Sequence, residues 1–341
     1  MNPFELRQLG RTGLEVTRFG FGGAPLGERF VPVDNGTAEA ILEHAGAVGI
    51  NYFDTAPQYG QGKSEARLGR YLQTRPRDSY VVSTKVGHLY DRPRDPRAFA
   101  AGLKGNGLHF QIRSDYSYDA VMRSYEHSLL RLGLNRVDLL VIHDIDISQH
   151  GTQQQVEAHL KELTTGGGWR ALKELKRTGE IKGIGCGVNE LGTFPQILDR
   201  GEVDFFLVAL PYTLLDQDAL DVEFPRCAER GVAIVIGAVF ASGILATGPT
   251  PDSRYAYAPA PEPVKAKVRR IEAVCRRHGV PLAAAALQFP LAHPLVAAII
   301  PGAHTVEVLK NNLALMRHVI PSDLWTELKA EELLRRDAPA P

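Results

Sequence analysis

Residues 137–143 read Val-Asp-Leu-Leu-Val-Ile-His, a short apolar run that ends on a histidine. The run from Asp138 to Ile142 does not alternate between apolar and polar residues, which is typical of a strand buried on both faces of a parallel sheet. Seven further runs of this kind occur along the chain, at residues 18–22, 50–54, 80–85, 183–188, 205–210, 233–237 and 297–300. The sequence therefore contains eight candidate strands.

Amphipathic stretches separate these runs. At residues 118–132, apolar side chains recur at Val121, Tyr125, Leu129 and Leu132, the spacing of one helix face. Similar stretches lie at residues 37–48, 64–71, 169–177, 218–230 and 264–278. Eight alternating strand and helix units in 341 residues predict an α/β protein with one domain, residues 1–341, folded as a (β/α)8 TIM barrel.

Three segments exceed a minimal barrel. Residues 87–117, rich in Pro, Gly and Arg, follow the third strand, and residues 144–168, which contain Gly166-Gly167-Gly168, follow the fourth. We expect both to be long loops on the face where a barrel builds its active site. Residues 322–335 predict an extra C-terminal helix.

Composition excludes several classes of function. Lys and Arg number 39, as do Asp and Glu, so the formal net charge is zero and favours neither a nucleic-acid nor a membrane partner. The three cysteines form no C-x-x-C pair, and residues 1–10 lack the apolar core of a signal peptide. These features predict free thiols and a cytoplasmic location, and they leave monomer and homodimer equally open.

Two nucleotide-binding motifs are absent or incomplete. No G-x-G-x-x-G occurs, because neither Gly20-Phe21-Gly22-Gly23 nor Gly183-Ile184-Gly185-Cys186-Gly187 completes its spacing. Gly62-Lys63-Ser64 is similar to the end of a P-loop, but residue 57 is proline where that motif needs glycine. We expect Ser64 to cap a helix instead.

Polar residues cluster where four of the strands end. These are Asp54 with Tyr59, Lys85, His143 and Asn189. A free tyrosine titrates near pH ~10, and a nearby lysine ammonium would lower the pKa of Tyr59 toward the range of a useful base. Asp54 would hold Lys85, and Tyr59 would take a proton in oxidation or give one in reduction. His143 would orient the substrate oxygen or share the proton relay.

A metal is the weaker interpretation of the same region. His143-Asp144-Ile145-Asp146 offers possible ligands, but no second histidine has suitable spacing. Neighbouring residues of a strand also point to opposite faces. The sequence therefore predicts no metal site.

The order and context of Asp54, Tyr59, Lys85 and His143 resemble the catalytic tetrad of the aldo-keto reductase superfamily. The resemblance extends from Leu9-Gly10-Arg11-Thr12-Gly13 to Asn312-Leu313. The insert at 87–117 and three short stretches look closest to the branch with D-threo-aldose 1-dehydrogenase and L-fucose dehydrogenase, which includes pyridoxal 4-dehydrogenase. Those stretches are residues 115–119, 130–134 and 142–144.

The resemblance implies a nicotinamide cofactor. Asn189 would bind its carboxamide, Tyr212 would stack on its ring, and the loop at 239–243 would cover its pyrophosphate. NADP-preferring relatives carry Lys or Arg where this chain has Gly302 and Val308, which favours NAD over NADP. The full set of implied cofactor contacts is Gly23, Asp54, Asn189, Tyr212, Ala238, Phe240, Ser242, Gly243, Ile300, Pro301, Gly302, Ala303, His304, Val308, Asn311 and Asn312.

The branch implies oxidation of the anomeric hydroxyl of an aldose to a lactone, with Tyr59 as general base and acid. L-Fucose, D-arabinose and L-galactose are the expected types of sugar. The alternatives are pyridoxal 4-dehydrogenase, a general NADPH-dependent aldehyde reductase and a regulatory subunit that binds the cofactor without turnover. We expect Tyr59, His143, Tyr90 and Phe110 to contact the substrate.

Overall fold

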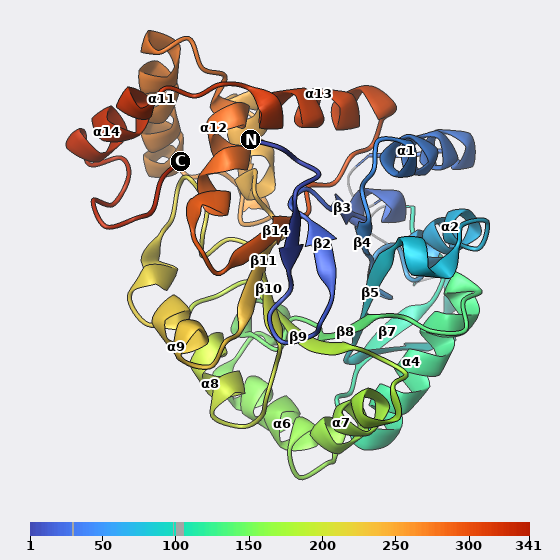
Figure 1. Ribbon diagram of the computed structural model, residues 1–341. Helices are drawn as coiled ribbons and strands as arrows, with labels where there is room; N and C mark the ends of the chain where they lie inside the picture. The colour runs from blue at the N-terminus through green and yellow to red at the C-terminus, as the bar shows by residue number, and fades with distance from the viewer. Residues whose placement is uncertain (29–30, 98, 100–105) are drawn as a thin grey trace.

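The architecture is a barrel of parallel strands surrounded by helices (Figure 1). The structure, a computed structural model, describes residues 1–28, 31–97, 99 and 106–341. Each barrel strand hydrogen-bonds to the next in the order β14-β11-β10-β9-β8-β5-β4-β3. The strands are β3 (Phe21–Gly22), β4 (Tyr52–Asp54), β5 (Val81–Val86), β8 (Leu139–Ile142), β9 (Gly183–Val188), β10 (Phe205–Val208), β11 (Ala233–Ile236) and β14 (Val296–Ile299).

The first and last strands meet and complete the barrel. Parallel bridges join Phe19 to Ile299 and Gly22 to Gly302. The amide of Gly20 donates to the carbonyl of Ile299 at 2.8 Å, and the amide of Ile299 donates to the carbonyl of Arg18 at 2.9 Å. The predicted (β/α)8 fold and its eight strands are therefore confirmed, with boundaries shifted by a few residues.

Alternation along each strand divides the core in two. Tyr52, Val81, Leu139 and Val141 belong to a cluster inside the barrel, which the N-terminal hairpin of β1 (Leu6–Gln8) and β2 (Glu15–Thr17) closes through Leu9 and Val16. The alternate residues of each strand point outward and pack against the helices. Because the interior residues of one strand are two apart, a polar residue at the end of that series must also point into the barrel.

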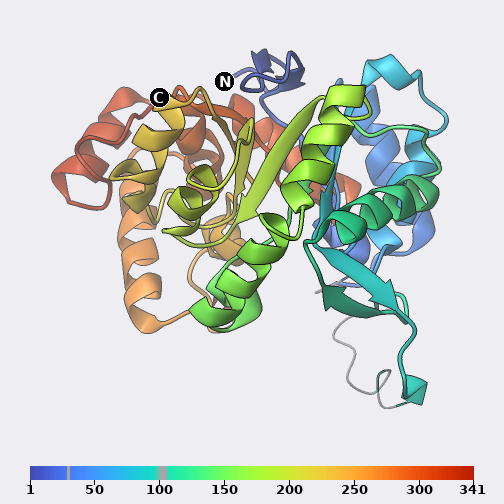
Figure 2. The same ribbon diagram turned by 90° about the horizontal axis from the view of Figure 1, so that it is seen from below.

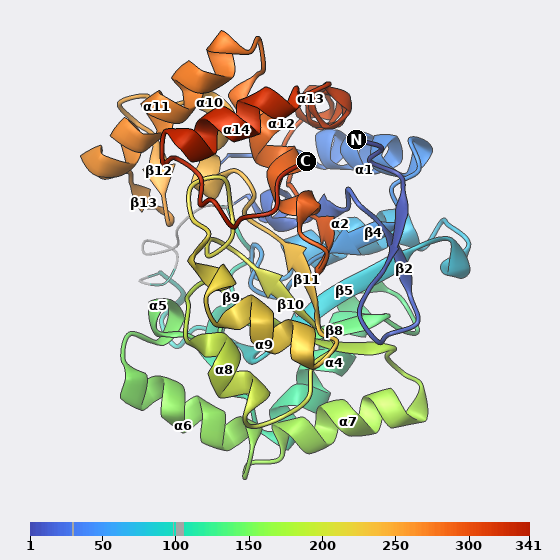
Figure 3. The ribbon, with the colours of Figure 1, turned by 60° about the vertical axis from the view of Figure 1, so that its left-hand side comes forward.

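Helices cover the outside of the sheet (Figures 1 and 3). The helix predicted at 118–132 is α4 (Tyr118–Leu132), and the extra C-terminal helix is α14 (Ser322–Ala330), which packs on α11. The other long helices are α1 (Asn35–Ala47), α2 (Lys63–Leu72), α7 (Gly168–Thr178), α11 (Glu262–Arg277) and α13 (Val306–Arg317). Shorter helices are α8 (Thr193–Leu198), α9 (Glu223–Glu229), α10 (Ile244–Thr247) and α12 (Leu282–Gln288).

The two long segments follow the third and fourth barrel strands as predicted, and each contains some regular structure that the sequence did not indicate. The segment after β5 contains an antiparallel hairpin of β6 (His88–Asp91) and β7 (Gln111–Ser114), which projects from the barrel (Figure 2). Its residues 98 and 100–105 lie outside the described residues. The segment after β8 contains α5 (Ile147–His150) and α6 (Gln153–Leu163), and the spacing of Val156, Leu160 and Leu163 explains why the second helix packs down.

Ser64 does not cap a helix. The N-cap of α2 is Gly62. Ser64 lies in the first turn of α2, where its buried hydroxyl donates to the carbonyl of Gly23 at 2.8 Å and pairs with Thr55 Oγ1 at 2.8 Å. Its role is thus to join the ends of β3 and β4.

Two further features are the state of the cysteines and the length and polarity of the helices. Cys186, Cys227 and Cys275 are buried free thiols. Within the described residues, every helix is too short or too polar to cross a bilayer.

Candidate active site

A buried ion pair lies inside the barrel, near the C-terminal ends of its strands. Asp54 continues the inward series of Tyr52, and Lys85 continues that of Val81 and Ser83. Lys85 Nζ donates to both carboxylate oxygens of Asp54, at 2.7 and 2.9 Å, and to the carbonyl of Thr55 at 2.8 Å. Ser83 Oγ donates to Asp54 Oδ1 at 2.7 Å. The ammonium is therefore fixed in one position although it is only about 1% exposed.

Tyr59 lies beside this ion pair, on the loop that follows β4. Lys85 Nζ is 4.7 Å from the centre of the Tyr59 ring. The loop packs against the segment after β3 so closely that a Cβ on Gly60, at φ +66°, would lie 2.4 Å from the carbonyl oxygen of Gly27. Only glycine fits there, which fixes how far Tyr59 can move.

The ionisation of Tyr59 differs from the prediction. Burial raises the pKa of Tyr59 well above its ordinary value of 10.0, and the negative charges of Asp54 and Asp144 raise it further. The charge of Lys85, which we expected to bring this pKa down, is largely offset by the Asp54 carboxylate that binds it with both oxygens, so the net shift of the Tyr59 pKa is upward. Without a further positive charge nearby, Tyr59 is a neutral hydroxyl and a proton donor.

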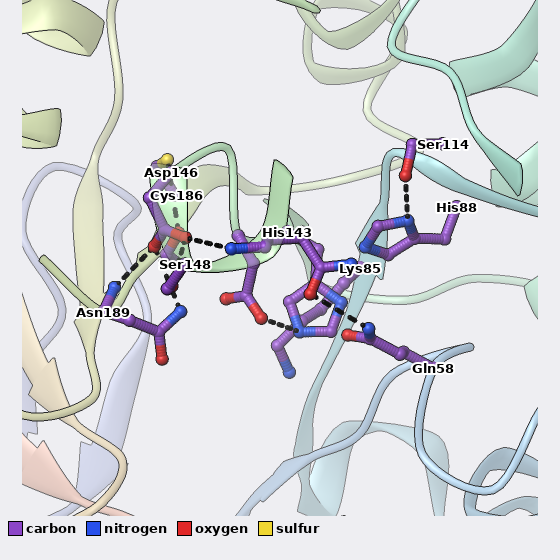
Figure 4. Close-up of polar contacts among 12 residues, drawn as sticks. Gln58, Lys85, His88, Ser114, His143, Asp146, Ser148, Cys186 and Asn189 are labelled. Atoms are coloured by element: carbon purple, nitrogen blue, oxygen red, sulfur yellow. Dashed lines mark hydrogen bonds and ion pairs between the residues drawn. The ribbon is translucent and has the colours of Figure 1, made fainter. Parts of the chain in front are cut away.

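His143 completes the group of four. It follows β8, and its ring centre is 5.8 Å from that of Tyr59 at an interplanar angle of 85°. Burial, and then the charge of Lys85, lower the pKa of His143 well below 6.5, so the ring is neutral. Its Nε2 lies 3.5 Å from Asp144 Oδ2 (Figure 4). The structure thus brings together all four side chains of the predicted tetrad.

Two residues that follow barrel strands have unusual backbone conformations. Asp144 has φ +45° and Leu210 has φ +137°, and neither is glycine. Such conformations cost of order 1–3 kcal/mol and concentrate at functional sites. The conformation of Asp144 places its carboxylate next to His143, an arrangement that sequence reasoning did not anticipate.

Asp146 is a second residue that sequence reasoning missed in this role. Its Oδ2 accepts from the amide of Asn189 at 2.8 Å and from Asn189 Nδ2 at 3.1 Å. Its Oδ1 accepts from Ser148 Oγ at 2.7 Å (Figure 4). Because one side-chain amide proton of Asn189 is held by a carboxylate, the side chain cannot flip its oxygen and nitrogen without losing that bond. The available signal was that Asp146 stands at the N-cap of a helix, α5.

The ends of β3, β11 and β14 suit a dinucleotide. Gly22 and Gly302 lie side by side, and a Cβ on Gly22 would lie 2.4 Å from the carbonyl oxygen of Ile300. After β11, right-handed Phe240 is followed by left-handed Ala241 and Ser242, at φ +46° and +62°. A right-handed residue followed by a left-handed one points successive amides into one concavity, which is a common anion site. The amide of Ala241 donates to the carbonyl of Ala238 at 2.8 Å, and contact of this loop with a pyrophosphate stays a prediction.

The other predicted cofactor residues are distributed along the same edge. Thr305 caps α13 through the amide of Val308 at 3.1 Å. Of the α13 residues, Asn312 is buried, Val308 is half-buried and Asn311 is exposed. Gly23, Ile300, Pro301 and Ala303 are buried, Ala238, Gly243 and Gly302 are half-buried, and His304 is exposed.

Tyr212, the residue predicted to stack on the nicotinamide, lies among other aromatic rings. Its side chain is wholly buried. It packs against Phe224, Phe289 and His293, with ring centres 4.7, 5.4 and 5.7 Å away. Three aromatic neighbours surround the ring, and its stacking on a nicotinamide stays a prediction.

Tyr90 and Phe110 lie together on the β6–β7 hairpin side of the site. Their rings stack with centres 5.6 Å apart, and the Tyr90 hydroxyl donates to the carbonyl of Pro57. Tyr90 therefore supports the loop that carries Tyr59, and Phe110 remains 43% exposed. Contact of either ring with a substrate stays a prediction.

Comparison with known proteins gives consistent matches. Residues 18–332 match the model of the aldo/keto reductase family. The chain is 43% identical to pyridoxal 4-dehydrogenase of Microbacterium luteolum, covering 97% of this chain and 98% of that protein. It is 38% identical to D-threo-aldose 1-dehydrogenase of a Pseudomonas species, covering 94% and 96%. The holo form of an aldo-keto reductase from Bacillus halodurans superposes with a TM-score of 0.74 at 26% identity, covering 97% of each chain.

Proposed function

Because this chain belongs to the aldo/keto reductase family and is an NAD(P)-dependent oxidoreductase, we propose that it oxidises the anomeric hydroxyl of an aldose to a lactone. Sugars of the L-fucose, D-arabinose or L-galactose type are the proposed substrates. The observation that carries this proposal is the acceptor-rich surroundings of His143, with the Asp144 carboxylate 3.5 Å from its Nε2.

The chemistry follows from the four central side chains. The nicotinamide cofactor, when bound, exchanges the hydride. Neutral His143 donates a hydrogen bond from Nε2 to the substrate oxygen, and Tyr59 exchanges the hydroxyl proton. Lys85, held by Asp54, keeps a positive charge 4.7 Å from the Tyr59 ring and limits the cost of forming phenolate. A positioned acid or base of this kind contributes about 10²–10⁴-fold to the rate.

The polar lining favours a substrate with several hydroxyl groups. Gln58, which directly precedes Tyr59, donates from Nε2 to Gln149 Oε1 at 3.4 Å (Figure 4). The carboxylate of Asp144 and the side-chain amides of Gln58 and Gln149 offer both acceptors and donors, which match the hydroxyls of a sugar ring. Such groups discriminate strongly, because a substrate without hydroxyls would leave them unpaired.

A second candidate is the oxidation of pyridoxal, whose cyclic hemiacetal also gives a lactone. It is favoured by the 43% identity to pyridoxal 4-dehydrogenase over nearly the whole chain. For the cofactor we propose NAD over NADP. The half-buried Val308 and Gly302 offer no cation to a 2′-phosphate, although exposed His304 and Lys310 lie on the same segment.

The test is reduction of NAD or NADP, followed by nicotinamide absorbance, with L-fucose, D-arabinose, L-galactose, D-glucose and pyridoxal. We expect rapid turnover of at least one of the first three sugars with NAD, and its loss in Tyr59→Phe. Activity with pyridoxal alone would establish the second candidate. Cofactor binding without turnover of any of these compounds would overturn both.

A further inference from the structure

Two buried imidazoles next to the site each have an unpaired nitrogen. His88 is 2% exposed and His143 is 3% exposed. His88 Nδ1 pairs with Ser114 Oγ at 3.2 Å. Neither His88 Nε2 nor His143 Nδ1 has a hydrogen-bond partner within residues 1–28, 31–97, 99 and 106–341. An unpaired buried polar atom costs about 1–3 kcal/mol, so two such atoms on neighbouring rings call for an explanation.

The two rings are neighbours because their strands are neighbours. Val86, at the end of β5, pairs with Ile142, at the end of β8, and the amide of His143 donates to the carbonyl of Val86 at 3.0 Å. Gly87 then turns the chain at φ +110°, where a Cβ would lie 2.1 Å from the Tyr116 ring. The turn brings His88 beside His143, with ring centres 5.3 Å apart and planes at 65° (Figure 4).

Both rings are neutral, which limits how they can pair. Burial, and then the nearby His150 and His159, lower the pKa of His88 to about 3. A neutral imidazole has one donor nitrogen and one acceptor nitrogen. His143 Nε2 faces the carboxylate of Asp144, which only accepts, and at 3.5 Å this contact favours a proton on Nε2 without fixing it there. His143 Nδ1 is then an acceptor that needs a donor.

We propose that His88 is a positioning residue that fixes the tautomer of His143. A small rotation of either ring brings the two unpaired nitrogens into line, His88 Nε2–H then donates to His143 Nδ1, and Ser114 Oγ–H donates to His88 Nδ1. In both hydrogen bonds the donor lies farther from the site than the acceptor. His143 therefore accepts at Nδ1 and presents Nε2–H to the substrate oxygen. The inference rests on the proposed function only for the role of that final donor.

The surroundings hold the pair neutral over a wide pH range. Lys85 disfavours a second proton on His143, as do His150 and His159 on His88. The Tyr116 hydroxyl donates to the carbonyl of His143 at 2.7 Å and also pairs with His150 Nε2 at 3.1 Å. Asp144 and Tyr59 also contact the His143 ring. The Asp144 carboxylate stabilises the Nε2–H tautomer, while the ring stays neutral.

The direct test is nitrogen NMR of histidine-labelled protein, which distinguishes the two tautomers without any turnover. In the wild type we expect His143 to carry its proton on Nε2 at neutral pH. In His88→Leu we expect a mixture of tautomers and a kcat lower by about 3- to 10-fold, the rate equivalent of one neutral hydrogen bond. His88→Gln, whose side-chain amide can still donate, should restore most of both properties.

The matched control is His159→Gln, which alters another histidine of the same cluster whose ring does not contact His143. If His88→Leu does not fold, Ser114→Ala removes the donor to His88 Nδ1 and should also mix the tautomers. A proton on Nδ1 of His143 in the wild type would overturn the inference, as would an unchanged spectrum and kcat in His88→Leu. Because NMR needs no substrate, a failure of the proposed sugar activity remains distinguishable.

Discussion

Lys85 Nζ bonds to both carboxylate oxygens of Asp54, at 2.7 and 2.9 Å, in a part of the barrel where both side chains are about 1–2% exposed. The free-energy cost of removing two charges from water offsets most of their Coulombic attraction, so the pair adds little net stability. Removing one partner is different, because the other charge is then buried alone.

We therefore expect Asp54→Asn to destabilise the protein by about 3–5 kcal/mol. The double variant Asp54→Asn with Lys85→Met should be destabilised by less than the sum of the two single variants. Urea unfolding of the four proteins measures this coupling. Additive effects would show that the pair is not a coupled unit.

Asp146 holds Asn189 by two hydrogen bonds from one carboxylate oxygen. Asp146→Ala frees the Asn189 side chain, and charge-assisted bonds of this kind are worth about 1.5–3 kcal/mol. We expect the dissociation constant for NADH to rise by about tenfold, measured by titration of protein fluorescence. Ser148→Ala is the control, since Ser148 contacts only the other oxygen of Asp146 and should leave NADH affinity nearly unchanged. Equal effects of both changes would contradict the role given to Asp146.

The positions of Asp54, Lys85 and His143 were predictable because they depend on strand parity. Once Val81 and Val141 are assigned to the interior, Lys85 and His143 must follow on the same side. The surroundings of Tyr59 were less predictable. The pKa of Tyr59 is raised by burial and by nearby carboxylates, among them Asp144. The position of the Asp144 carboxylate depends on a φ of +45°, which no sequence pattern predicts.

Tyr212 shows a different limit of sequence reasoning. Its expected stacking came from resemblance alone, whereas the direction of a side chain after a strand depends on the local backbone. Leu210 adopts φ +137° two residues earlier, and Tyr212 lies in the aromatic core with Phe224 and Phe289. Likewise, the helix α6 was hidden because glycines and polar residues around it suggested a loop.

The low pKa of His88 predicts acid sensitivity. The folded pKa, about 3, lies below the ordinary 6.5, so between these values the unfolded chain binds a proton that the folded protein does not. Stability is therefore present above about pH 6.5 and is lost as pH falls toward 3, by about 1.4 kcal/mol per pH unit for this residue. Urea unfolding over this range should show a smaller slope for His88→Gln than for the wild type. An identical slope would mean that other groups account for the acid sensitivity.

The buried Tyr59 predicts different pH dependences for the two directions of reaction. Its pKa is raised above 10.0, so the neutral form dominates at all ordinary pH values. Reduction uses this form as the acid, and its kcat/KM should change little between neutral and mildly alkaline pH. Oxidation needs the phenolate, whose fraction rises tenfold per pH unit below the pKa, and kcat/KM should rise with pH. Steady-state rates in both directions test this. A rise of both rates with pH would assign the proton transfer elsewhere.

Cofactor preference is testable on α13. Val308 is half-buried in the first turns after the Thr305 cap. An arginine there would offer a charge-assisted bond to a 2′-phosphate, worth about 1.5–3 kcal/mol. We expect Val308→Arg to raise kcat/KM for NADP by about tenfold or more and to change that for NAD little. Val308→Met, similar in length but uncharged, is the matched control. If the wild type already prefers NADP, or if Val308→Arg and Val308→Met behave alike, the adenosine end does not lie against this face of α13, and the NAD preference loses its structural basis.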